Sequence, residues 1–567
     1  MYRAFDEHVK RNVKSLNGIW KMKKDENNVG IHEGWCCGFN DGVNTTVPSV
    51  WNSEFGMLSY EGVVWYQNEF YTSGGCLRFV FEGVMTDSII YLDGNRITAH
   101  YGGFDAFDVI VPDVKCGYHI LVVRVDNTFD SVSIPQAFVD WYHYGGIIRS
   151  VSVETLNGVS VLNQRFEYTL NRDLSDAICY INLDLYNASR YARTSNVSIF
   201  INNERVTDFE ISLESGEYKT IKSPEFMVGN LMLWSTDNPK LYNILVTTES
   251  DDLYDRIGFR KIEVHNAKIL LNGKELELKG VNRHEEYPDF GFAFPTSLMQ
   301  RDIDIIKDLG CNSIRGSHYP NSKIFLDMLD EAGILFWSEI PIWGCGFTAE
   351  AIGNDTVIER GAHMLINMVK QYYNHPAIII WGMHNEIPSN TDNGLKMTKE
   401  YHAILKDIGG NRLITYASHI PLSDICLSYC DVISINQYLG WYGGEISEWD
   451  GFIEKFRNRR KELGLENIPV IMSEFGAAAL YGHHTFDDVH WTEEYQAKLF
   501  KYTLDLFMKD PMIIGYYAWQ FCDIRTCLEA GINRARGFNN KGLLNEHRKP
   551  KQAYYAVKNA YTGGNNQ

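Results

Sequence analysis

The sequence predicts a multidomain fold in which a jelly-roll-like β-sandwich and an immunoglobulin-like β-sandwich precede a (β/α)₈ TIM barrel. First, 567 residues are too many for one ordinary core, so two to four domains are expected. Second, short stretches of alternating apolar and polar residues fill the chain up to residue 264. Third, beyond residue 265 longer apolar runs alternate with amphipathic helical segments, which is typical of a parallel barrel.

Residues 1–156 are predicted to form the first sandwich, a domain of the sugar-binding-like type. Stretches such as SIIYLDGNRIT and YHILVVRVDN alternate apolar and polar residues and are separated by Gly, Asn and Asp turns. Residues 157–264 continue the pattern of short alternating stretches, but with a different composition, as in ICYINLDLYNAS and SNVSIFINNERV. We therefore expect a second sandwich there, of immunoglobulin-like type.

Residues 265–567 are expected to form the catalytic barrel. Eight strand candidates lie at 275–282, 311–318, 334–341, 378–386, 412–419, 431–438, 469–476 and 513–523. Amphipathic segments such as 297–310, 323–333 and 359–373 lie between them. Eight strands with intervening helices in this length predict a closed barrel, and the final TGGNNQ is expected to be a loose tail.

Composition excludes several classes of function. A formal net charge of −19 argues against nucleic acid or an anionic membrane as partner. No apolar run is long enough to span a bilayer and no signal peptide is visible, so a cytoplasmic protein is expected. The eleven cysteines show no zinc spacing and no phosphate loop occurs, so we expect reduced thiols, no metal and no cofactor. The 13 Trp, 33 Tyr and 29 Phe are numerous enough to supply sugar-stacking surfaces.

Two glutamates close predicted barrel strands. Glu386 follows the apolar run at 378–381, and Glu474 ends the seventh strand in SEFGA. Strand ends meet at the catalytic face of such a barrel, and strands four and seven oppose each other across its mouth. One glutamate alone would suggest a structural residue bonded to backbone or Arg. Two carboxyl groups that face each other across a pocket are typical of a glycosidase. If the configuration at the anomeric carbon is retained, the two carboxyl groups must lie roughly 5 to 5.5 Å apart.

The segments WGMHNEIP, SEFGA, GVNRHEE and SIRGSHYP resemble the signature segments of glycoside hydrolase family 2, and the likeness extends over essentially the whole chain. The resemblance implies that Glu386 is the acid/base, that Asn385 bonds the sugar 2-hydroxyl and that Glu474 is the nucleophile.

Within this family, NQYLGWY and GFNNKG resemble the β-glucuronidase branch, whose Asn-x-Lys element binds the sugar carboxylate. Asn539 and Lys541 match that element. A uronic acid carries a permanent anion at C6, which an ammonium and an amide bind through charge-assisted hydrogen bonds of roughly 1.5 to 3 kcal/mol. The alternative for FNNKG is a surface turn, which the same residues also describe.

The same matching implies seven further site residues. The aromatic wall of the sugar pocket would consist of Tyr438, Tyr442 and Trp519, and the sugar ring would be faced by His284. Asp140 would reach from the first sandwich to the 4-hydroxyl. The two carboxylates would be oriented by Arg315 and His318.

The chain departs from the branch at two places. Gln437 stands where the branch usually has Arg, which leaves its local charge partner unknown. Residues 342–355, after the third strand, are short where some relatives carry a long loop over the aglycone site, so we expect an open mouth.

These observations predict a retaining exo-β-glucuronidase that hydrolyses terminal β-D-glucuronosides through a covalent glycosyl-enzyme. The substrate would be a small-molecule conjugate or a glucuronate-ended oligosaccharide, and we expect a homo-oligomer. A β-galacturonidase differs only at C4, and Arg534 or Arg536 could serve either uronate. A β-galactosidase or β-mannosidase would not need Lys541. An inactive carbohydrate-binding scaffold would not need both Glu386 and Glu474.

Overall fold

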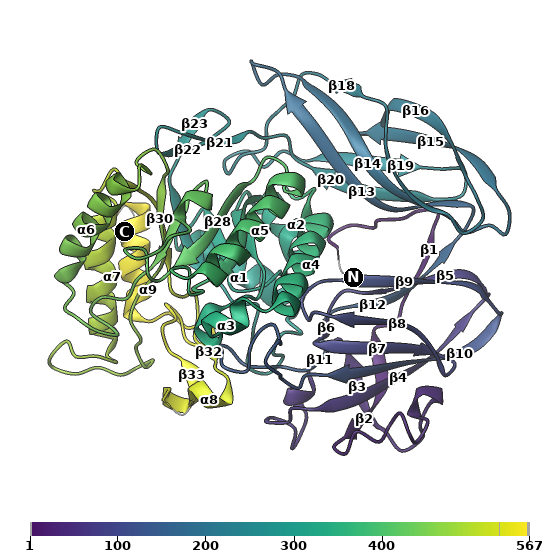
Figure 1. The fold of residues 1–567 in the computed structure, drawn as a ribbon, viewed down its shortest axis with the longest axis horizontal. Helices are drawn as coiled ribbons and strands as arrows, with labels where there is room; N and C mark the ends of the chain where they lie inside the picture. Colours follow the sequence, from purple (N-terminus) through teal and green to yellow (C-terminus); the bar gives the residue numbers. More distant parts are fainter. Residues whose placement is uncertain (1–2, 532, 564–567) are drawn as a thin grey trace.

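The computed structural model describes residues 3–531 and 533–563. Of the expected tail, residues 564–567 lie outside the described part. The barrel forms one half of the molecule, and two stacked sandwiches form the other (Figure 1).

Eight parallel strands close into a barrel in chain order, which confirms the predicted fold class. Their bounds are β24 (Leu278–Asn282), β25 (Ser313–Gly316), β26 (Leu335–Glu339), β27 (Ile378–Asn385), β28 (Leu413–Ser418), β29 (Ile433–Asn436), β30 (Val470–Phe475) and β31 (Ile513–Ala518). Every residue of β27 is buried. A parallel strand covered on both faces has no solvent side, and for this reason the sequence shows a continuous apolar run instead of an alternation.

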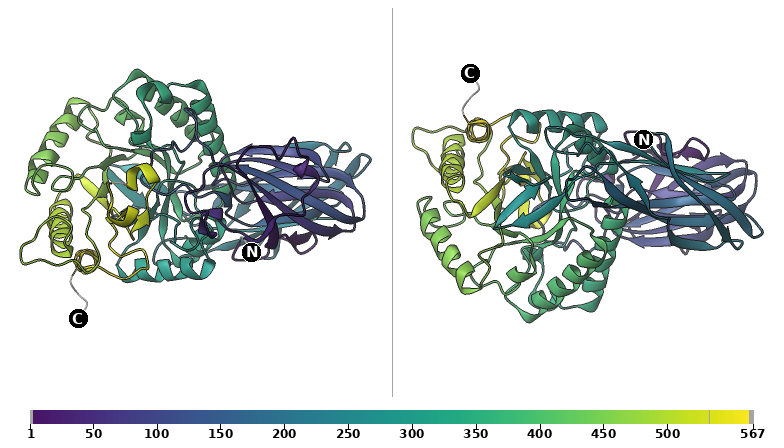
Figure 2. Two further views of the ribbon diagram at one scale, coloured as in Figure 1. Left: turned by 90° about the horizontal axis from the view of Figure 1, so that it is seen from below. Right: turned by 90° about the horizontal axis from the view of Figure 1, so that it is seen from above.

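Helices surround the barrel in both views of Figure 2. They are α1 (Thr296–Asp308), α2 (Lys323–Ala332), α3 (Ala349–Ile352), α4 (Asp355–Tyr372), α5 (Asp392–Ile408), α6 (Glu448–Glu462), α7 (Glu493–Phe507), α8 (Leu528–Gly531) and α9 (Gln552–Thr562). Asn354 caps α4 by accepting a hydrogen bond from the Thr356 N–H, and Thr492 caps α7 in the same way. Between β28 and β29 there is only the 3₁₀ helix η4 (Leu427–Tyr429), so one of the expected crossover helices is missing.

The first sandwich pairs a four-stranded and a six-stranded antiparallel sheet. The first sheet contains β1 (Asn12–Ser15), β12 (Val151–Leu156), β5 (Gly75–Phe81) and β9 (Phe107–Val114). The second contains β3 (Val43–Val47), β2 (Gly18–Asp25), β4 (Val63–Thr72), β10 (Gly117–Asp126), β7 (Asp87–Leu92) and β8 (Asn95–Tyr101). A short pair, β6 (Val84–Met85) and β11 (Gly146–Ile147), and the 3₁₀ helices η1 (Trp35–Cys37) and η2 (Trp51–Ser53) complete it.

The second sandwich also consists of two antiparallel sheets. One contains β13 (Val159–Leu170), β14 (Ala177–Asn187), β17 (Tyr218–Lys222) and β18 (Phe226–Val228); the other contains β16 (Glu204–Leu213), β15 (Arg193–Ile201), β19 (Tyr242–Thr247) and β20 (Asp252–Ile257). A small sheet of β21 (Ile262–His265), β22 (Lys268–Leu271) and β23 (Lys274–Leu276) then leads into the barrel. The domain boundaries expected at 156/157 and 264/265 stay predictions, and β21 spans the second of them.

The two ends of the barrel carry different elements. The sheet β21–β23 lies at one end (Figure 1). The pair β32 (Ile524–Arg525) and β33 (Phe538–Asn539) lies with α8 at the opposite end, and the 3₁₀ helices η3 (Gly344–Gly346) and η5 (Ala535–Gly537) belong to the loops after β26 and β31. The carboxyl ends of the strands therefore face α8 and β33.

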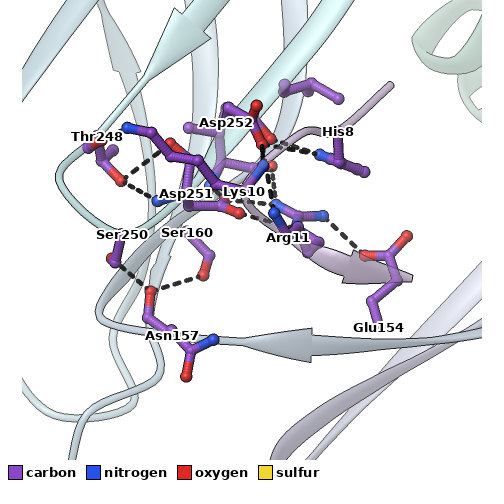
Figure 3. Close-up of polar contacts among 12 residues, drawn as sticks. His8, Lys10, Arg11, Glu154, Asn157, Ser160, Thr248, Ser250, Asp251 and Asp252 are labelled. Carbon is purple, nitrogen blue, oxygen red and sulfur yellow. Dashed lines mark hydrogen bonds and ion pairs between the residues drawn. The ribbon is translucent and has the colours of Figure 1, made fainter. Parts of the chain in front are cut away.

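The N-terminal segment joins the first sandwich to the second. Arg11 is buried and forms ion pairs with Asp251, beside β20, and with Glu154 of β12, with the latter oxygen 2.7 Å away (Figure 3). Asp252 accepts hydrogen bonds from the backbone N–H groups of Val9 and Lys10. Among the described residues, no helix combines the length and the hydropathy needed to cross a bilayer.

Candidate active site

Two glutamates meet at the carboxyl end of the barrel. Glu386 directly follows β27 and is half-buried, whereas Glu474 lies in β30 and is buried. The sixth strand bridges them: Asn436 Nδ2 donates to Glu386 Oε1 over 2.8 Å, and the Tyr438 hydroxyl, two residues on, donates to Glu474 Oε2 over 2.6 Å. The structure thus brings together the two carboxylates that the sequence placed on separate strands.

Arg315 of β25 forms an ion pair with Glu474 inside the barrel. Its Nη1 lies 2.7 Å from Glu474 Oε1, while Nε and Nη2 each lie 2.9 Å from an oxygen of Glu339. His318 Nδ1 also contacts Glu339, at 2.8 Å. Because the guanidinium is fully buried and its fork is shared between two carboxylates, it fixes the position of Glu474.

Opposing effects act on the ionisation of Glu474. Burial raises the pKa of this carboxyl to about 8, and the nearby Glu386 charge raises it as well, whereas Arg315 and the Tyr438 hydroxyl lower it. A pKa near neutrality in a buried carboxyl with a specific charge partner is typical of functional sites. Burial and the Arg315 charge hold the pKa of His318 well below its usual range, which favours the neutral imidazole.

Asn385 has one side of its amide engaged and one side free. Its Oδ1 accepts from Arg315 Nη2 at 2.7 Å and from Asn436 Nδ2 at 3.0 Å. These contacts fix the amide orientation. Its Nδ2 is buried without a hydrogen-bond partner in the described part of the chain, as are Nε2 of His284 and Nε2 of His318. Asn385 Nδ2 is a donor, whereas Nε2 of a neutral His318 is an acceptor, because its Nδ1–H faces Glu339. Buried polar atoms without partners are costly, so this side of the site suits a polar ligand.

The predicted aromatic residues form two groups. Trp519 stacks on His318 with ring centroids 5.1 Å apart and meets His284 edge-on at 5.6 Å. Tyr438 meets Tyr442 edge-on at 5.3 Å. The Trp519 group is almost completely buried, whereas Tyr442 is exposed and offers ring surface of the kind that packs against a sugar.

A charged cluster lies next to Tyr438. Lys541 Nζ contacts the Tyr442 hydroxyl at 2.6 Å and lies 5.5 Å from the centroid of the Tyr438 ring. Asp140 accepts from Asn539 Nδ2 at 2.7 Å and from Arg534 Nη2 at 2.7 and 2.9 Å. Arg534 therefore pairs with Asp140, whereas no ion pair joins Lys541 to a described carboxylate.

The surface-turn alternative for FNNKG is wrong, because Asn539 and Lys541 are both buried. Arg536, one of two arginines considered for a uronate, instead pairs with Glu546 at 2.7 Å and is half-exposed, so only Arg534 joins the cluster. Gln437 donates its backbone N–H to the Glu474 carbonyl and accepts the Tyr438 N–H on Oε1.

Three residues of the site were missed from the sequence. Asn282, Glu339 and Asn436 are the last residues of β24, β26 and β29, and Asn282 Oδ1 accepts from Arg315 at 3.1 Å. The strand-end argument that singled out Glu386 and Glu474 finds all three when it is applied to every barrel strand.

Two His/Asp groups with ligand-like spacing occur in the described chain, both away from this site. They are His8, Asp251 and Asp252, and Asp327, Asp330 and His375. In each group an arginine already engages a carboxylate: Arg11 binds Asp251 and Arg3 binds Asp327. These ion pairs account for the clustering.

Comparison with known proteins agrees with this geometry. Residues 262–566 match the TIM barrel domain model of glycosyl hydrolases family 2, and residues 159–260 match a second model of that family. A β-galacturonidase from Eisenbergiella tayi, solved with galacturonate bound, is 34% identical with a TM-score of 0.93, over 99% of both chains. A β-glucuronidase from Ruminococcus gnavus, solved with D-glucaro 1,5-lactone, is 27% identical with a TM-score of 0.87, also over 99% of both chains.

A putative β-glucuronidase from Formosa agariphila is 27% identical over 88% of this chain, which spans 64% of that relative's length. The fold and the paired carboxylates are those of a glycoside hydrolase. The chain belongs to glycoside hydrolase family 2, in the branch that contains the β-glucuronidases.

Proposed function

We propose that this glycoside hydrolase is a retaining exo-β-uronidase that removes terminal β-D-glucuronosyl groups. The observation that supports this most strongly is the position of Lys541. Its ammonium lies 5.5 Å from the ring of Tyr438, whose hydroxyl donates to Glu474. A cation that pairs with no carboxylate of the described residues, one aromatic ring away from the proposed nucleophile, suits a sugar that carries an anion at C6.

The proposed roles follow from the contacts of each carboxyl. Glu474 accepts from Arg315 and Tyr438, and because Arg315 can only donate, these contacts favour the carboxylate needed for attack on the anomeric carbon. Glu386, more exposed and held by Asn436, would protonate the leaving oxygen and later activate water. Asn385 would donate its free Nδ2 to the 2-hydroxyl.

Azide rescue tests these roles. We expect Glu386→Ala to form the β-glycosyl azide, because azide then attacks the α-linked glycosyl-enzyme, and Glu474→Ala to form the α-azide by direct displacement. Activated substrates with good leaving groups should partly spare Glu386→Ala, since little protonation is needed. Exchanged products would reverse the two assignments.

A β-galacturonidase is the second candidate. Its support is the 34% identity to the galacturonidase solved with galacturonate. The cluster beside Lys541 also suits either epimer, because the Asp140–Arg534 pair presents both an acceptor and a donor. Activity on the β-glucuronide, β-galacturonide and β-galactoside of one phenol decides among the three: a dominant galactoside activity would refute both uronidase proposals.

The natural aglycone class, a small conjugate or a glucuronate-ended oligosaccharide, belongs to the same proposal. The homo-oligomer and the cytoplasmic location expected from the sequence stay predictions.

A further inference from the structure

A cavity of about 220 Å³ lies at the end of the barrel opposite the glutamates. Its wall comes from β13 of the second sandwich, from residues just after β20, and from the loops that precede β27 and β28. Lining residues include Tyr168, Arg260, Tyr373 and Arg412. The cavity thus lies where the second sandwich meets the amino ends of two barrel strands.

Arg260 is almost completely buried in this wall, with 1% of its surface exposed. Its Nε donates to the Pro376 carbonyl at 2.7 Å, and its Nη2 donates to the Ile378 carbonyl, the first residue of β27. Its Nη1 is buried and has no hydrogen-bond partner in the described part of the chain. Neutral carbonyls supply no counter-charge, and no described carboxylate lies within 4.0 Å of this guanidinium.

Arg412 lines the same cavity and adds a second positive charge. It lies 4.6 Å from the centroid of the Tyr373 ring, donates through Nη2 to the Tyr373 and His375 carbonyls, and has a buried Nε without a partner among the described residues. It forms no ion pair with a described carboxylate. Burial and the Arg412 charge lower the pKa of Arg260 to about 10, in keeping with two positive charges on one cavity.

Negative charge around the cavity is already engaged. Glu167 is the carboxylate in the lining, and it binds Arg165 Nε at 3.1 Å and the Tyr373 hydroxyl at 2.6 Å. Asp330, which also acts on Arg260, pairs with His375 at 2.6 Å. The arrangement therefore leaves an excess of positive charge and two donors without partners in one enclosed space.

We propose that this cavity is an anion site for a phosphate- or sulfate-type oxyanion, bound between Arg260 and Arg412. Guanidinium groups match such oxyanions through parallel N–H donors. The space equals the liquid volume of about seven waters, at about 30 Å³ each, which accommodates the five heavy atoms of a tetrahedral oxyanion. Bound there, the anion would join the second sandwich to the start of β27, the strand that leads to Glu386.

Calorimetric titration with inorganic phosphate at constant ionic strength tests the site. The Lys541 cluster could itself attract anions, so the titrations are made in Lys541→Met as well as in the unmodified chain. We expect one site that persists in Lys541→Met and is weakened about ten- to hundredfold in Arg412→Met, the range expected for a lost charge-assisted contact. Arg412→Lys should recover part of the affinity, and Arg205→Met, an exposed arginine of the same sandwich, should have no effect.

A crystal soaked in selenate provides a second measurement that needs no variant. An anomalous peak between the two guanidiniums supports the site, whereas a peak beside Lys541 alone overturns it. Absence of binding of both inorganic phosphate and methyl phosphate, or binding unchanged in Arg412→Met, also overturns the proposal. Methyl phosphate, compared with inorganic phosphate, tells whether the anion is taken up free or as a monoester, and binding of either supports the site.

Discussion

Single side chains at the barrel mouth connect β27 and β30, the two strands that carry the proposed catalytic glutamates. Arg315 of β25 contacts Glu474 of β30 and Asn385 of β27, and Asn436 of β29 contacts both Asn385 and Glu386. Each of these contacts joins residues that are far apart in the sequence. The presence of the glutamates at strand ends could be predicted, because strand position follows from local pattern. The donors that hold them could not, because the pattern does not specify which strand-end side chains reach each other.

The sharpest prediction at this scale concerns Lys541. If its ammonium binds the substrate carboxylate, Lys541→Met should lower kcat/KM for a β-glucuronide by about two to four decades, since the recognition element supplies roughly 3 to 5 kcal/mol. Hydrolysis of the matching neutral β-glucoside should hardly change, because that sugar makes no ion pair with Lys541. The measurement is the ratio of the two kcat/KM values in both proteins.

Arg536→Met is the matched control for this experiment. Arg536 lies in the same loop as Lys541, and its substitution by Met removes the same charge. Unlike Lys541, however, Arg536 pairs with Glu546 and is half-exposed. It should leave the acid-to-neutral ratio within a factor of a few. If the ratio of kcat/KM for the acid to kcat/KM for the neutral glycoside is unchanged in Lys541→Met, the uronate assignment is wrong. The enzyme would then be grouped with the members of its family that act on neutral sugars.

Glu286 gives a pH-dependent prediction. Burial raises the pKa of this carboxyl to about 7, and its Oε1 accepts from the Tyr144 hydroxyl. The folded state therefore holds a proton that the unfolded chain releases near pH 4.5, so stability from this residue is present below that pH and is lost as pH rises to about 7. Glu286→Gln mimics the protonated form at every pH.

We expect Glu286→Gln to gain stability relative to the unmodified chain between pH 5 and pH 8, by up to about 3 kcal/mol. Denaturant midpoints of both proteins at the two pH values measure this difference. A constant difference across the range would show that the carboxyl is already ionised in the folded protein at pH 5.

At the scale of elements, the barrel strands were the most predictable part of the chain. All eight candidates contain the observed strands, because strands covered on both faces produce apolar runs with polar ends. The connection from β28 to β29 is the exception, where η4 replaces a crossover helix. A helix is needed only to cover the barrel, and the sequence pattern of a short covering loop does not differ from that of any other loop.

The Asp140–Arg534 pair shows a different limit. These residues lie 394 positions apart, and their ion pair depends on how the first sandwich docks on the loop after β31. Docking of preformed elements is set by shape and contact over whole surfaces. The resemblance to a known family placed Asp140 near the site, and Arg534 was considered for a uronate, but no local pattern predicted that the two would pair.

The loop after β26 carries a prediction about substrate size. Residues 342–355 contain η3, α3 and the first residue of α4, and Trp343 packs against Phe138 of the first sandwich with ring centroids 6.2 Å apart. If this short loop leaves the aglycone side open, as the sequence predicts, a small aglycone makes few contacts there. We expect a comparatively high KM for phenolic glucuronides and turnover of glucuronate-ended oligosaccharides. Steady-state kinetics on both substrate classes measure this, and a strong preference for the small phenol would contradict the open mouth.

At the scale of the whole molecule, the N-terminal segment connects all three parts of the fold. Arg3 pairs with Asp327 of α2 and with Asp255 of β20, and Arg11 pairs with Glu154 of the first sandwich and Asp251 of the second. A site assembled from the first sandwich and the barrel requires these parts to keep their relative positions. The segment is therefore expected to support the site without touching it.

Two arginines bridge the same pair of sandwiches and allow this idea to be tested. Arg11 is buried with both of its carboxylate partners, whereas Arg190 pairs with Asp113 at the surface, with side chains 80% and 62% exposed. Removing Arg11 takes the cation away from the buried Asp251, while Glu154 keeps a contact with Arg78 at 3.3 Å. We expect a cost of about 3 to 5 kcal/mol for this change, whereas an exposed pair contributes less than about 1 kcal/mol.

We therefore expect Arg11→Met to lower the denaturant midpoint strongly and Arg190→Met to change it little. Arg11 lies among the residues that join the two sandwiches (Figure 3). Because it contacts neither Glu386 nor Glu474, the folded fraction of Arg11→Met should keep its kcat/KM. Equal midpoints for the two variants would show that the N-terminal segment does not hold the sandwiches together. A loss of kcat/KM in fully folded Arg11→Met would instead show that sandwich position controls the site directly, through Asp140 and its contact with Arg534.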